Sequence, residues 1–107
     1  MGQTLDLSTD LGFLRIAAAV PVLRVADVSF NVRSIIEAIK KAGNEGVQVL
    51  TFPEMAVTGY TIGDLMPHQA LLSKAEQGLS NILDQSSGSN MVVIVGMPLS
   101  TEQKIFN

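Results

Sequence analysis

The chain has 107 residues, a net charge of −3, 47% hydrophobic residues and no cysteine. A chain of this length forms one small domain at most, and this hydrophobic content excludes a disordered protein. The low charge, without a basic cluster, argues against nucleic acid or an anionic membrane surface as a partner, and the lack of cysteine excludes a disulfide framework.

Two apolar runs in the first half of the chain predict β-strands. Residues 15–20 begin with Arg15, are otherwise apolar on both faces and end at Pro21. Three of residues 47–52 are β-branched, at alternate positions, and the run ends at a second proline. Residues 1–10, which precede both runs, are polar and irregular and predict a flexible N-terminal lead-in, so we expect the domain to span residues 11–107.

A helix is expected after each of these strands. The first has Asn31 as its expected N-cap, and Gly43 or Gly46 supplies its left-handed exit. The second spans residues 69–85, where Gly78 is less favourable than alanine by about 1 kcal/mol. In both helices the apolar residues recur at the spacing of one buried face: Val32, Ile35, Ile36, Ile39 and Ala42 in the first, and Leu71, Leu72, Ala75, Leu79, Ile82 and Leu83 in the second.

The last part of the chain predicts a third buried strand at residues 91–97, which gives the order β-α-β-α-β. This order indicates an α/β fold with parallel or mixed neighbouring strands. Residues 99–107 then predict a hairpin turn and a strand that stops after three residues without a partner, too short to be useful in a sheet. A sheet cut short in this way would expose an apolar face and an unpaired edge, and both would favour self-association.

The strongest candidate for a catalytic residue follows the second strand. Pro53 offers no N–H to a sheet, so Glu54 lies where the chain leaves the sheet, at the kind of edge where α/β sheets bind ligands. Its apolar neighbours Phe52, Met55 and Val57 would desolvate the carboxylate and strengthen it as a general base. The same pattern fits a strand-end glutamate that merely faces water.

The residues around Glu54 have weaker signals. Tyr60 fits two interpretations, a substrate-binding residue that packs against or hydrogen-bonds the carboxylate, and a residue that anchors its loop. Gly59 most simply supplies a positive φ. His68 is the single histidine and has no metal-ligand spacing to the carboxylates, so no metal site is expected. No apolar run is long enough to span a membrane, and we expect a cytoplasmic protein.

Phe52-Pro53-Glu54, with Thr58-Gly59-Tyr60 after it, resembles the glutamate segment of the nitrilase (carbon–nitrogen hydrolase) superfamily. The flanking segments are similar to the glutaminase domain of bacterial glutamine-dependent NAD synthetases, and the resemblance extends from about residue 11 to residue 107. It implies a four-layer αββα sandwich, of which this chain would be the incomplete N-terminal portion. The flanking segments are residues 12–19, 25–27, 31, 59–65 and 92–99.

The resemblance implies hydrolysis of the glutamine side-chain amide by a cysteine nucleophile, a glutamate base and a lysine that stabilises the oxyanion. Glu54 matches the glutamate of that family. The chain has no cysteine, and its four lysines lie outside the motif of the family's lysine. We therefore expect the chain alone to be inactive, since a base without a nucleophile has nothing to activate.

The resemblance also implies the ligands of a longer parent protein. Ammonia from glutamine would pass to a separate domain that uses ATP and Mg²⁺ to amidate deamido-NAD, so this chain itself would hold no cofactor. The parent would be a homo-oligomer paired through outer helices. Two alternatives stay open: another amidase of the same superfamily, and a complete non-catalytic α/β interaction module with a flavodoxin-like sheet.

Overall fold

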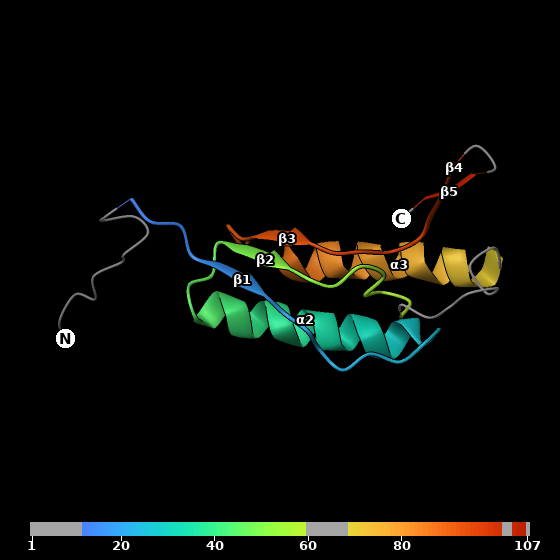
Figure 1. The fold of residues 1–107 in the computed structure, drawn as a ribbon, viewed down its shortest axis with the longest axis horizontal. Helices are drawn as coiled ribbons and strands as arrows, with labels where there is room; N and C mark the ends of the chain where they lie inside the picture. Colours follow the sequence, from blue (N-terminus) through green and yellow to red (C-terminus); the bar gives the residue numbers. More distant parts are fainter. Residues whose placement is uncertain (1–11, 60–68, 102–103, 107) are drawn as a thin grey trace.

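The computed structural model describes residues 12–59, 69–101 and 104–106, so the predicted lead-in and the loop that contains Tyr60 lie outside the described residues. Strands and helices alternate along the chain and end in a hairpin (Figure 1). This order confirms the predicted β-α-β-α-β pattern and the α/β fold. The elements are β1 (Ile16–Ala18), α2 (Val28–Asn44), β2 (Val49–Thr51), α3 (Gln69–Ser86), β3 (Val92–Ile94), β4 (Leu99–Thr101) and β5 (Lys104–Phe106).

The first three strands form one parallel sheet in the order β1-β2-β3, with β2 at its centre. Neighbouring strands are in register, so residues of one row point to the same face of the sheet. The middle row is Ala17, Leu50 and Val93. The rows before and after it point to the opposite face, and they consist of Ile16, Val49 and Val92, and of Ala18, Thr51 and Ile94.

The two helices pack against each other and cover only the face of the sheet to which Leu50 points. Leu50 is 2% exposed, whereas Ile16 and Val92 on the other face are 68% and 58% exposed. The third strand, which the sequence predicts to be buried, is therefore exposed on the face of Val92 and Ile94. Parallel strands carry apolar side chains on both faces of their sheet, and here the helices cover only one of the two faces.

The first helix begins earlier than predicted, and Asn31 is not its N-cap. Asp27 caps α2 by accepting a hydrogen bond from the backbone N–H of Phe30 at 3.1 Å. The helix therefore starts at Val28, which extends the buried face by one turn, and Asn31 lies inside the helix with no exposed surface. At the other end Gly46 supplies the predicted positive φ, at +74°, whereas Gly43 is helical.

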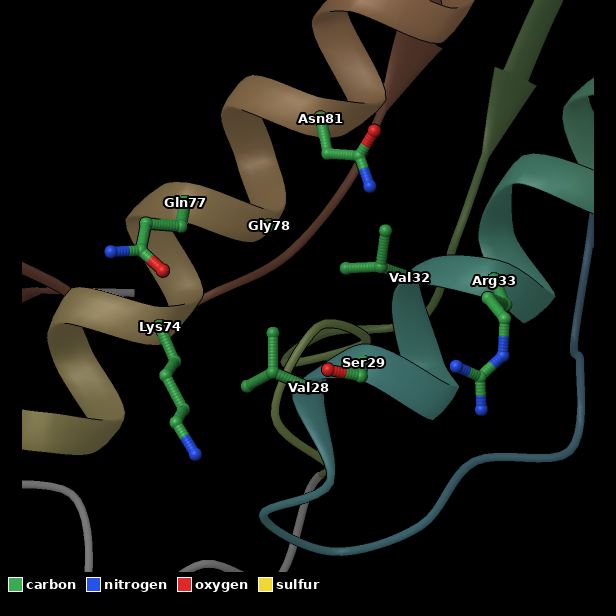
Figure 2. A pocket seen from close by; sticks show the side chains of 8 residues that line it. All are labelled: Val28, Ser29, Val32, Arg33, Lys74, Gln77, Gly78 and Asn81. Carbon is green, nitrogen blue, oxygen red and sulfur yellow. The ribbon is translucent and has the colours of Figure 1, made fainter.

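Gly78 is the point where α3 approaches α2. A Cβ atom at this position would lie 2.8 Å from Cγ2 of Val32 and 3.0 Å from Cγ1 of Val28, both closer than normal contact. Figure 2 shows both valines pointing across the interface toward Gly78. The glycine that is unfavourable for helix propensity therefore permits the close packing of the two helices. Leu83, predicted on the same face of α3, is instead 61% exposed.

The final strand has a partner, contrary to the prediction. β5 pairs with β4 in an antiparallel hairpin, with Leu99 opposite Phe106. This hairpin is separate from the parallel sheet, and β4 contacts α3. Neither helix in the described part of the chain has the length and apolar character needed to cross a membrane.

Candidate active site

Glu54 lies directly beyond the carboxyl end of the central strand. The N–H of Phe52 donates the last sheet hydrogen bond, to the carbonyl of Ile94 on β3 at 2.9 Å. Pro53 follows, and the chain turns from Glu54 onward. The prediction that the strand stops at this proline is confirmed. Because β1, β2 and β3 are parallel, their carboxyl ends share this edge of the sheet with Glu54.

The predicted desolvation of Glu54 is wrong for the described part of the chain. Phe52, Met55 and Val57 are 7%, 3% and 0% exposed, yet Glu54 itself is exposed. The reason lies in the turn, which directs the apolar side chains into the core while the glutamate stays at the edge. The apolar neighbours thus anchor the segment and do not enclose its carboxylate.

The backbone after Glu54 is strained. Met55 has a φ of +60°, a left-handed conformation that is rare outside glycine and less favourable by about 1–3 kcal/mol. Its carbonyl accepts hydrogen bonds from the N–H groups of Thr58, at 3.3 Å, and Gly59, at 2.8 Å. Gly59 has a φ of +87°, as predicted. Strain of this kind persists only where the surroundings enforce it, and it is common at functional sites.

Two segments distant in sequence hold this turn, and sequence analysis missed both. The carbonyl of Gly96, beyond β3, accepts a hydrogen bond from the N–H of Val57 at 3.1 Å. On the helix side, the side chain of Asn31 donates to the carbonyl of Val57 at 3.0 Å, and the N–H of Ala26 donates to the carbonyl of Thr58 at 2.6 Å. An asparagine among helical apolar positions was a signal for such a role, because a buried amide needs partners.

Two grooves lined by described residues lie away from Glu54. One of about 360 Å³ runs between α2 and α3, with Val28 and Val32 at its floor and Arg33 and Lys74 at its rim (Figure 2). Another, of about 310 Å³, lies between β1 and α2. Glu54 lines neither of them. Among the described residues, no group of three histidine, cysteine, aspartate or glutamate side chains is placed to hold a metal ion.

Comparison with known proteins identifies relatives over most of the chain. A model of the carbon-nitrogen hydrolase family matches residues 15–107. A glutamine-dependent NAD(+) synthetase of Mycobacterium bovis is 29% identical over 96 residues, which are 90% of this chain and 14% of that protein. The enzyme of the same name from Xanthomonas campestris is 36% identical over 95 residues, covering 88% of this chain and 17% of that protein.

A solved structure extends the similarity to the fold. The crystal structure of a glutamine-dependent NAD(+) synthetase from Cytophaga hutchinsonii superposes with a TM-score of 0.81 at 28% identity. The match covers 88% of this chain and 16% of that one. The chain thus spans only about a sixth of the length of these relatives, and the resemblance seen in the sequence motifs is confirmed.

Proposed function

This chain belongs to the carbon-nitrogen hydrolase family, and on that premise we propose that it supplies the general base for glutamine hydrolysis in a glutamine-dependent NAD synthetase. The observation that carries the proposal is the place of Glu54, on a strained turn at the carboxyl end of the central strand. The similarity to proteins of that name over about nine-tenths of the chain supports the choice of substrate.

The proposed reaction proceeds through a thioester. The carboxylate of Glu54 takes the proton of a cysteine thiol, and the sulfur attacks the carbon of the glutamine side-chain amide. The proton returns to the leaving nitrogen, and ammonia departs. Glu54 then takes a proton from water as the water attacks the thioester, which releases glutamate and restores the thiol. The sum is glutamine plus water giving glutamate plus ammonia.

The other groups of this reaction belong outside the chain. It contains no cysteine, and we assign the nucleophile and the oxyanion-stabilising lysine to other parts of the same enzyme. In the proposal, ATP and Mg²⁺ act in a separate domain where the ammonia amidates deamido-NAD, and no step in this chain uses them. The exposure of Glu54 is compatible with this division, because the carboxylate is accessible to groups from elsewhere.

The alternative of a flavodoxin-like interaction module lacks support from the strand order. Such modules bind ligands where the order of the strands reverses, and there β1 lies between its neighbours. Here the described parallel sheet runs β1-β2-β3 without reversal. The other alternative, a different amidase of the same family, would give Glu54 the same role as general base.

The proposal is tested in the product of the complete reading frame that encodes this chain. Glu54→Gln keeps the shape of the side chain but removes the base, so kcat/KM for glutamine should fall by about 10²–10⁴. Glu76→Gln, at an exposed position of α3, is the matched control and should retain activity. Undiminished ammonia release by the Glu54 variant, or a reading frame without a cysteine, would contradict the proposal.

The 107-residue chain provides a second test. Purified alone, it should release no ammonia from glutamine beyond the amount released by its Glu54→Gln variant, because it has no thiol to activate. A coupled assay for ammonia measures this directly. Glutamine turnover that depends on Glu54 in the isolated chain would show that the nucleophile has been misassigned.

A further inference from the structure

Gly96 lies against the backbone that carries the proposed base. A Cβ atom on Gly96 would lie 2.5 Å from the backbone nitrogen of Met55 and 3.0 Å from Cα of Glu54. Both distances are too short for any other residue without movement of the turn. Gly96 is not among the glycines with positive φ, so close approach is the reason that this position excludes a side chain.

The same glycine also binds the far end of the turn. Its carbonyl accepts the N–H of Val57, so Gly96 contacts the segment at Glu54 and Met55 and again at Val57. Gly96 therefore fixes the turn from the side of β3. A Cβ atom at position 96 would therefore displace the backbone N–H of Met55 and the Cα of Glu54 together.

Asn31 fixes the turn from the opposite side. Its Oδ1 accepts the N–H of Arg24 at 2.7 Å, and its Nδ2 donates to the carbonyl of Arg24 at 2.8 Å and to that of Val57 at 3.0 Å. The side chain has no exposed surface, so water cannot replace these bonds. If the side-chain amide of Asn31 were reversed, its NH₂ group would face the N–H of Arg24. The hydrogen bonds therefore define one orientation of this amide.

We propose that Gly96 and Asn31 are positioning residues for Glu54, which they hold through the backbone of its turn. Glu54 projects from this turn, so a movement of the turn would move its carboxylate as well. Reactions that require one group within proton-transfer distance of another lose about 10²-fold in rate for a displacement of about 1 Å. This inference rests on the proposed role of Glu54 as the base.

Gly96→Ala in the product of the complete reading frame tests this role. We expect kcat for glutamine hydrolysis to fall by about 10- to 100-fold with KM changed less than about threefold, because the base is misplaced while substrate binding is retained. Gly43→Ala is the matched control, since its Cβ would meet only Cε of Met91 at 3.7 Å. Asn31→Asp keeps the acceptor but removes both donors, and we expect the same pattern.

A double variant separates positioning from general damage. In the Glu54→Gln background Gly96→Ala should produce no further loss of kcat, because no base remains to be misplaced. A further loss as large as that in the native background, or a kcat within twofold of native for the single variant, would overturn the inference. If Glu54→Gln alone leaves activity intact, the proposed function is wrong. The hydrogen-exchange measurement described next still tests whether Gly96 holds the turn.

Hydrogen exchange in the 107-residue chain provides that measurement. Gly96→Ala should accelerate exchange of the Val57 amide by at least about tenfold, since this amide bonds to the displaced carbonyl, while amides in the middle of α2 and α3 keep their native rates. Gly43→Ala should leave the Val57 amide unchanged. Equal acceleration throughout both helices would indicate a general loss of structure and would contradict a positioning role.

Discussion

The two faces of the parallel sheet contain similar residues but have different surroundings. On the helix-covered face Leu50 is 2% exposed, and the neighbouring side chains belong to one core shared with α2 and α3. On the bare face Ile16, Val92 and Ile94 are 68%, 58% and 53% exposed. The hydrophobic pattern of a strand therefore shows that both of its sides can be buried. Which side is buried depends on the elements that pack against the sheet.

The comparison also bears on the position of Glu54. The covered face holds the residues that anchor its turn, since Met55 and Val57 join the same core as Leu50. The bare face contributes no anchor that the described residues reveal. Substitutions in the helix-covered layer should therefore change stability more than substitutions on the bare face, and four predictions test this inequality.

The largest effect is expected from Leu50→Ala on the covered face. Removal of a nearly fully buried leucine side chain should lower the free energy of unfolding by about 2–5 kcal/mol. Urea denaturation, followed by circular dichroism, measures the change. A loss below about 1 kcal/mol would mean that the core closes over the vacancy, and that the covered face is less tightly packed than the structure indicates.

The next effect is expected at the contact between the helices. Gly78→Ala should destabilise the chain by about 1–3 kcal/mol, because its Cβ would overlap Val32 and Val28. In Gly43→Ala the new Cβ would make only an ordinary van der Waals contact, with Met91. This variant should stabilise the chain by about 0.5–1 kcal/mol, because alanine has the higher helix propensity. Opposite signs in thermal denaturation are the expected result, and stabilisation by both variants would contradict the helix contact.

A smaller effect is expected at the start of the helical layer. Asp27→Ala removes the side chain that accepts the N–H of Phe30, and it should destabilise the chain by about 1 kcal/mol. Asp27→Asn retains the capping oxygen and should recover most of the loss. An unchanged midpoint for the alanine variant in urea denaturation would show that α2 does not depend on this cap.

The smallest effect on stability is expected on the bare face. Threonine at positions 92 and 94 (Val92→Thr with Ile94→Thr) keeps the β-branched shape, and it should change the free energy of unfolding by less than about 0.5 kcal/mol. We expect the native chain to self-associate through this apolar face, and this double variant to associate less in sedimentation velocity. A native chain that sediments as a compact monomer and melts cooperatively would contradict that expectation.

The sequence was sufficient for the kind and order of the elements, because their patterns are local. Residues 69–85 were predicted as a helix and Gln69–Ser86 is observed, and Pro53 marked the end of β2. The strands proved shorter than predicted, with β1 limited to Ile16–Ala18. Hydrogen bonding to a neighbouring strand sets these limits, and hydrophobic pattern does not contain that information.

The errors came from contacts between distant residues. Asn31 has the chemistry of an N-cap, but its partners are Arg24 and, across the fold, Val57. The apolar spacing that begins at Val28 was the signal that the helix starts there, with Asp27 as its N-cap. For the candidate site, the sequence placed Glu54 at the sheet edge but misjudged its exposure, because the direction of a side chain at a strained turn depends on packing behind it.

The contact between Gly96 and the Glu54 turn has a consequence for synthesis on the ribosome. Glu54 is translated well before Gly96, so the nascent chain displays the acidic residue before the carbonyl that accepts the N–H of Val57 exists. The hydrogen bond that holds the turn from the side of β3 can therefore form only after residue 96 has emerged from the exit tunnel.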